Sequence, residues 1–139
     1  EKKQKKSRVQ MPEQPPKDVV MVRLGVCAQR RGDWAEARKL FEAVGKRFQS
    51  GDASNLASRQ LRWPHDFYTI QVGAFSQQNR ATTLCNQLQA KGIHAVQRRD
   101  VMGGRDLWLV QTGQYATYAQ AGEAARNVRR VVADAMIVP

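Results

Sequence analysis

The sequence predicts an α+β protein. Its carboxyl-terminal half is expected to fold as βαββαβ, a ferredoxin- or RNP-like four-stranded antiparallel sheet with two helices on one face, behind a small all-α segment. Apolar residues recur at helical spacing over residues 18–63 and alternate as in a strand after residue 66. One phrase also occurs twice, as YTIQVGAFSQQNRA over 68–81 and WLVQTGQYATYAQA over 108–121. Each copy leads from a strand into a helix, so the second half of the domain repeats the first.

Changes of composition divide the chain into three parts. Residues 1–17 are basic and rich in Gln and Pro, which predicts a linker or tail without regular structure. Residues 18–63 form the helical segment, and residues 66–139 form the βαββαβ domain. Trp63-Pro64-His65-Asp66 joins them, because proline keeps the preceding residue out of the helical conformation.

The chain is strongly basic. Its 139 residues include 23 Lys and Arg against 12 Asp and Glu, a formal charge of +11. This surplus favours polyanionic partners such as nucleic acid, anionic lipid or a carboxylate-bearing cell-wall polymer, although a solvated tail and helix surfaces also account for it. No apolar run is long enough to cross a membrane, so we expect membrane contact only through an upstream anchor. Cys27 and Cys85 lie on apolar helical faces and are expected to be small core residues.

Two antiparallel helices and a shorter third one are expected in residues 18–63. Gly32 suits the end of the first helix, and Asp33 suits the cap of the second. The third helix, over Ala53–Leu61, follows Gly51 and could cover the pair.

The helical pair resembles a tetratricopeptide repeat. The residues that carry the resemblance, at that family's spacing, are Leu24-Gly25, Gly32, Trp34, Ala37 and Phe41. The chain departs from the pattern at Ala28 and Gln49. The resemblance implies small residues where the helices touch and a protein partner for the segment. One repeat cannot bury its apolar face alone, so we expect either the end of a longer array capped by Ala53–Leu61, or packing on a partner or on the second module.

In the first half of the βαββαβ domain, alternation predicts a strand over Phe67–Gly73. Ser76 is the expected cap of a helix that runs to about Lys91, and Ile93–Arg99 is the expected second strand. Glycine should end the first strand, and Phe75 should fill the core beneath the corner that follows.

The second half repeats this plan after a hairpin at Gly103-Gly104. A strand is expected over Leu107–Thr112, ended by Gly113, with Tyr115 beneath the corner. Thr117 and Gln120 form a capping-box signature for the next helix. Ala135–Val138 is the last expected strand.

Residues of both halves resemble a SPOR domain. The resemblance rests on YTIQVGAF at 68–75, KGIHA at 91–95 and WLVQTGQY at 108–115, and it covers residues 66–139. It implies the βαββαβ fold and a non-catalytic module that binds peptidoglycan, preferentially glycan strands stripped of their stem peptides. It also implies a place in the bacterial cell envelope or periplasm, in cell division or wall remodelling.

Alternation selects the candidate binding residues, because an antiparallel sheet can leave one face to solvent. Thr69, Gln71, Leu109 and Gln111 should point away from the helices, whereas Trp108 should point toward them. On spacing alone, plain polar coverage of an exposed surface explains the two glutamines better than a binding site does. The resemblance favours glycan contact through Gln71, above a floor of Thr69, Gln111 and Leu109. Met136 and Arg98, with His94 and Val96, would form the rim, and Ala74 replaces a serine that is usual in the family.

Other functions receive less support. RNA-binding domains of the same fold need aromatic rings on the open faces of the first and third strands, and Thr69, Gln71, Leu109 and Gln111 offer none. The helical segment could instead be the main element, as a protein-interaction scaffold. No nucleophile–base set, phosphate-binding loop, paired carboxylates or metal-ligand spacing stands out, so we expect no enzyme, cofactor or metal site.

Overall fold

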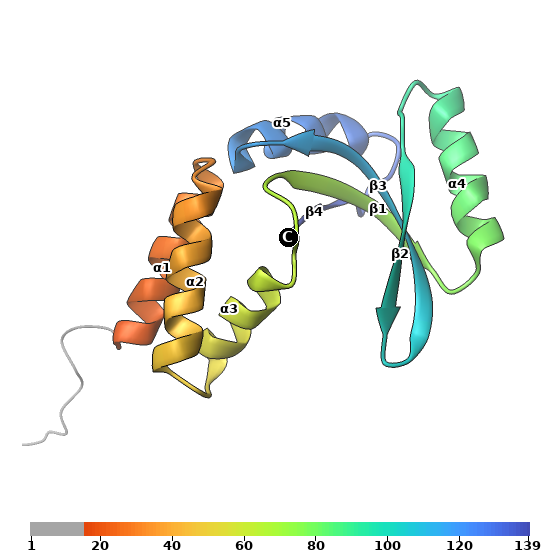
Figure 1. Ribbon diagram of the computed structural model, residues 1–139. Helices are drawn as coiled ribbons and strands as arrows, with labels where there is room; N and C mark the ends of the chain where they lie inside the picture. Colours follow the sequence, from red (N-terminus) through yellow and green to blue (C-terminus); the bar gives the residue numbers. More distant parts are fainter. Residues whose placement is uncertain (1–15) are drawn as a thin grey trace, which may run out of the picture.

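The computed structural model describes residues 16–139. The predicted amino-terminal tail lies outside this range except for its last two residues, and Lys17 already belongs to the first helix, so the tail prediction is wrong there. Within the described range, three helices are followed by a sheet with two helices (Figure 1).

The three helices of the first unit are α1 (Lys17–Arg30), α2 (Trp34–Arg47) and α3 (Asp52–Leu61). α2 begins as predicted, with the Asp33 carboxylate accepting a hydrogen bond from the Glu36 backbone N–H at 3.2 Å. α1 and α2 meet closely at Gly25, where a Cβ atom would lie 2.7 Å from the Phe41 ring. A small residue is therefore required at Gly25. The shared core contains Val22, Ala28, Ala37, Phe41, Val44 and Ala57.

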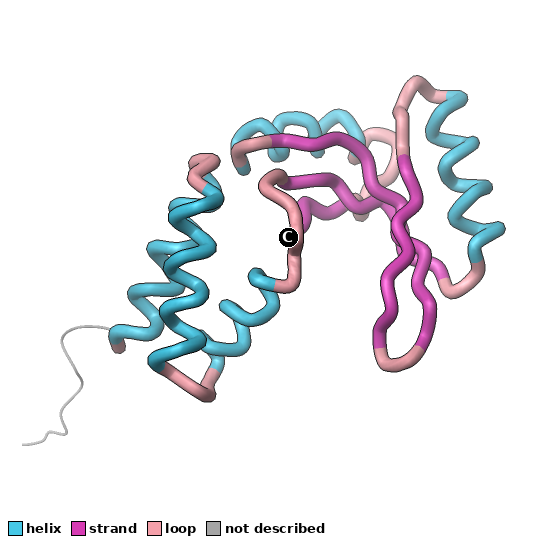
Figure 2. The backbone as a smooth tube through the Cα atoms, in the orientation of Figure 1, coloured by secondary structure: helices cyan, strands magenta, loops and turns pink. Residues whose placement is uncertain are grey.

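The second unit confirms the predicted α+β fold. Its elements, in chain order, are β1 (Tyr68–Phe75), α4 (Gln78–Ala90), β2 (Val96–Met102), β3 (Arg105–Tyr115), α5 (Tyr118–Val128) and β4 (Met136–Val138). The four strands form one antiparallel sheet in the order β2-β3-β1-β4. The β2–β3 hairpin extends beyond the other two strands (Figure 2). Its turn is Gly103-Gly104, as predicted, with φ of +59° and +78°.

α4 and α5 cover one side of the sheet, and the alternation is as predicted there. Ile70 and Val72 of β1 and Val110 of β3 are buried in a core with residues of both helices, namely Ala81, Leu88, Ala125 and Val128. Trp108 packs against this core, which agrees with its expected direction. The opposite side of the sheet carries the candidate binding residues.

The doubled phrase has a different structural meaning from the one predicted. β1 and β3 do not end at Gly73 and Gly113 but continue to Phe75 and Tyr115. The register between them shifts near both glycines, so these positions are bulges. A Cβ atom on Gly73 would lie 2.8 Å from the Phe75 ring, and one on Gly113 would collide with Tyr115. Each glycine therefore makes room for the aromatic ring two residues later, which packs on the helix-side core.

Other element ends differ in part from the prediction. The Thr117–Gln120 capping box at α5 is confirmed in both directions. The Ser76 cap is wrong, because α4 begins at Gln78 behind Gln77 and no side chain caps it. β2 lies three residues later than predicted, since Ile93 packs against the core before the strand begins.

The two units are joined by buried contacts. The Trp34 indole lies 4.9 Å from the Tyr68 ring, centroid to centroid, and its N–H donates to the Ala116 carbonyl at 2.9 Å. The Tyr68 hydroxyl donates to Gln29 Oε1 at 3.3 Å, and Gln29 Nε2 donates to Gln60 at 3.1 Å. Burial is the main cause that raises the pKa of Tyr68 to about 12. The helical segment therefore packs on the second module, which is one of the expected alternatives.

The two cysteines differ in their surroundings. Cys27 is exposed, so its core assignment is wrong, because α1 buries its opposite face through Val22, Gly25 and Ala28. Cys85 is half-buried against the sheet core, and burial raises the pKa of its thiol.

Candidate functional site

The candidate site lies on the side of the sheet away from α4 and α5. Strand pairing places two rows of side chains there. One row crosses all four strands as Met136, Gln71, Gln111 and Val96. The neighbouring row crosses three strands as Ala74, Leu109 and Arg98. The pairing therefore brings most of the predicted site residues together. Thr69 lies outside the two rows, two residues before Gln71 on the same side of β1, and His94 lies before the start of β2.

Two of these residues are buried, contrary to prediction. Thr69 is 2 % exposed and Gln111 is 1 % exposed. The Thr69 hydroxyl lies within donating distance of the Thr112 and Gly113 carbonyls, at 3.1 and 2.7 Å, so it satisfies the backbone at the β3 bulge. Gln111 Nε2 donates to Gln71 Oε1 at 3.4 Å. Both residues therefore support the surface from beneath, and their burial keeps them out of contact with a ligand.

The segment between α3 and β1 lies over this side of the sheet. Trp63, His65 and Phe67 form a cluster in which His65 stacks on Phe67 at 4.8 Å and Trp63 meets both rings edge-on. The Trp63 indole N–H donates to the Phe67 carbonyl at 2.9 Å. We call these three residues the linker rings. They are half-buried, and they add to the site the aromatic surface that the strands lack.

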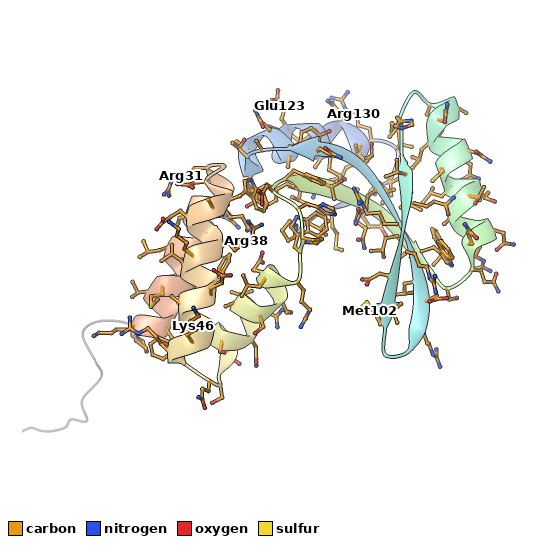
Figure 3. All side chains as sticks on the ribbon, in the orientation of Figure 1. Arg31, Arg38, Lys46, Met102, Glu123 and Arg130 are labelled. Atoms are coloured by element: carbon orange, nitrogen blue, oxygen red, sulfur yellow. The ribbon has the colours of Figure 1, made fainter. Side chains whose placement is uncertain are left out.

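An ion pair fixes the linker to the first unit. Arg38 of α2 and Asp66 form it at 2.6 Å. Figure 3 shows Arg38 on the side of α2 that faces the linker. The linker rings are therefore held from both ends, by the helices and by the sheet.

Arg98 connects the linker rings to the sheet. Its Nη1 lies 3.3 Å from His65 Nε2, and arginine must be the donor of this hydrogen bond because it has no acceptor atom. Its guanidinium carbon lies 6.0 Å from the Phe67 ring centre. Its Nε is buried without a hydrogen-bond partner in the described part of the chain, and the same holds for Gln111 Oε1. Two polar atoms of this site are thus left unsatisfied by residues 16–139.

Fewer residues of the site are accessible to solvent than the sequence predicts. Gln71 and Leu109 are half-buried, Ala74 is exposed, and Val96 and Met136 are 42 % and 54 % exposed. His94 is exposed in the turn before β2. The linker rings are the residues that sequence reasoning missed, although three rings within the five residues WPHDF are an unusual density that could have drawn attention.

Comparison with known families decides what kind of domain this is. A family model described as the SPOR domain matches residues 64–139, more than half of the chain. The chain belongs to the SPOR domain family. The match begins at Pro64, so three of the four joining residues and two of the linker rings lie inside the SPOR region.

The chain is also similar to a solved structure, at 26 % sequence identity and a TM-score of 0.41. That structure is described as the solution structure of the peptidoglycan binding domain of the B. subtilis cell wall lytic enzyme CwlC. The alignment covers 52 % of this chain and 86 % of that one. No curated protein matches.

No group of three or more His, Cys, Asp and Glu side chains within residues 16–139 could hold a metal ion. No helix in that part is both long and apolar enough to pass through a membrane.

Proposed function

We propose that this SPOR domain binds the glycan strands of peptidoglycan, without catalysis, at the sheet side that carries Gln71. The observation that carries the proposal is the half-buried Gln71 amide at the centre of that side, within a region that belongs to the SPOR family. The amide offers two donors and an acceptor, which suits the hydroxyl and acetamido groups of a sugar chain. Leu109 and Ala74 would contact the apolar faces of the sugars.

Gln111 supports this arrangement from below. Its Nε2 holds Gln71 Oε1, so the amide nitrogen of Gln71 is turned toward other acceptors. A fixed side chain loses less conformational entropy when it binds, which raises affinity. Burial of Gln111 is therefore compatible with a binding role for its neighbour.

The test is co-sedimentation with purified peptidoglycan from which an amidase has partly removed the stem peptides. Gln71→Ala should weaken binding by roughly three- to tenfold, the effect of one neutral hydrogen bond. Gln89→Ala, which removes an exposed amide on α4, is the matched control and should bind as the unchanged protein does. Equal binding by both variants would contradict this site.

Single-stranded RNA is the second candidate ligand. Two observations support it: the linker rings and Arg98 lie on the side of the sheet that corresponds to the base-stacking side of RNA-binding domains, and the formal charge is +11. RNA binding should weaken steeply with salt. Competition between RNA and peptide-free glycan for one site decides between the two, and we expect glycan to displace RNA.

We further propose that the helical unit contacts another protein and that the SPOR domain places this pair in the bacterial periplasm, at sites of division or wall remodelling. Val20 and Leu24 of α1 are 37 % and 53 % exposed, and with Cys27 they form an apolar stripe on the outer side of the helix. The tetratricopeptide-like pattern supports this role.

A further inference from the structure

Arg38 and Arg98 are the half-buried arginine side chains of residues 16–139, and of these two only Arg38 has a carboxylate partner within that range. Within residues 16–139, the two ion pairs join Arg38 to Asp66 and Arg99 to Asp106, so neither involves Arg98. Its side-chain hydrogen bond in that range goes to the His65 ring, which carries no negative charge. A half-buried charge is costly unless an opposite charge accompanies it. The surroundings of Arg98 therefore favour an anion.

The guanidinium is also held in place. It lies between β3, where Leu109 is its cross-strand partner, and the linker rings, which it contacts through His65 and Phe67. Leu109 belongs to the proposed glycan site, and Gln71 lies beyond it on β1, in the adjacent row of side chains. Arginine with free N–H groups in a fixed orientation recognises carboxylates by paired hydrogen bonds.

Peptidoglycan offers one carboxylate on the glycan itself. Every second sugar carries a lactyl ether, and its carboxyl group forms the amide bond to the stem peptide. Hydrolysis of this amide adds water, releases the peptide amine and leaves a free lactyl carboxylate. A glycan without peptides is thus an anionic polymer, whereas a peptide-bearing sugar has a neutral amide at the same position.

We propose that Arg98, positioned by His65, binds the lactyl carboxylate and thereby distinguishes peptide-free from peptide-bearing glycan. The proposal rests on the glycan-binding function proposed above and assigns its specificity to one charge pair. His65 acts as a positioning residue, because it holds one N–H of Nη1 and leaves the other N–H of Nη1 and those of Nη2 for the ligand.

The test uses fluorescently labelled glycan strands released by an amidase, in two forms. One keeps the lactyl carboxylates, and in the other a carbodiimide has coupled them to methylamine, which restores a neutral amide. The unchanged protein should bind the carboxylate form roughly tenfold or more tightly, as expected for a charge-assisted pair. Arg98→Gln should bind both forms equally, with the affinity that the unchanged protein has for the amide form.

Three further variants separate charge recognition from folding. Arg99→Gln removes an exposed arginine of the same strand and should keep the full preference. Arg98→Lys should keep part of the preference, because it retains the charge but not the paired donors. His65→Gln, which can still accept from Arg98, should keep more of it than His65→Ala. Melting temperatures confirm that each variant is folded.

The outcomes are distinct. If the unchanged protein binds both forms equally, the assignment of Arg98 is wrong, while glycan binding stands. If Arg98→Gln keeps the preference, another group reads the carboxylate and the proposal is overturned. If neither form binds, the proposed function fails, and the Arg98 subsite fails with it.

Discussion

At the scale of single residues, Gly73 and Gly113 explain why the chain contains the same phrase twice. Each stands two residues before an aromatic ring and lies beneath it. Gly113 also has φ of +80°, which other residues rarely adopt. The repeated Gln-x-Gly-x-aromatic pattern thus places a glutamine on one side of the sheet and a ring on the other. Core packing and the binding side are coupled in one short motif.

Replacing Gly113 tests this coupling. Gly113→Ala should lower the free energy of unfolding by at least about 2 kcal/mol, because a left-handed non-glycine residue is strained and the Cβ collides with Tyr115. Gly45→Ala is the control: Gly45 lies in α2 with no neighbour near its Cβ position, and the change should stabilise the protein by about 0.5–1 kcal/mol. Urea unfolding measures both values. Equal effects would refute the role of Gly113.

The alternation of residues along a strand predicts the side of the sheet on which a side chain lies, but not how much of that side chain is exposed to solvent. Alternation along β1 and β3 correctly placed Gln71 and Gln111 on the side away from the helices. It could not show that Gln111 is 1 % exposed, because burial on that side depends on the linker, which approaches from outside the sheet. Exposure is a property of the assembled molecule, whereas parity is a property of one strand.

At the scale of elements, periodicity predicted every helix and strand of the described chain and misplaced several of their ends. For β1 and β3 the missed ends have a common cause: glycine predicts the end of a strand, but here it forms a bulge inside the strand. The helix starts depended on side-chain chemistry. Asp33 and Thr117 cap as expected, whereas α4 begins without any side-chain cap, so no residue could have marked its start.

The linker was the least predictable element. Pro64 follows the end of α3 at Leu61 and begins the SPOR match, but no local pattern predicts that the segment after it lies over the sheet. Its position over the sheet depends on tertiary contacts of three residues with distant partners, namely Asp66 with Arg38, His65 with Arg98 and Phe67 with Arg98. Local patterns hold no information on such contacts.

At the scale of the whole molecule, the helical unit and the SPOR domain share a buried joint. Trp34, Tyr68 and Ala121 form a cluster of their own, and they come from α2, β1 and α5. Side-chain hydrogen bonds connect this cluster to α3: Tyr68 bonds to Gln29, and Gln29 bonds to Gln60. We therefore expect the orientation of the helical unit relative to the sheet to be fixed, so that a protein held by the helices would have a defined position over the glycan.

The joint predicts a pH dependence of stability. The pKa of Tyr68 is about 12 in the folded chain against 10.0 for an ordinary tyrosine, so the folded state holds the proton more tightly. The protonated Tyr68 therefore contributes about 3 kcal/mol to the free energy of unfolding. This contribution is fully present below pH 10 and is lost as the pH rises toward 12. Tyr68→Phe has no proton to lose. Urea unfolding between pH 9 and 12 should show a steeper fall for the unchanged protein, and parallel curves would refute a buried, protonated Tyr68.

The most direct test of glycan binding at the described side of the sheet is an NMR titration of the isotope-labelled protein with peptide-free glycan strands. Backbone amide signals of Gln71, Ala74, Leu109 and Arg98 should shift, while those of α4, on the opposite side, should stay in place. Shifts confined to α4 and α5, or no shifts at saturating glycan, would contradict the proposed function.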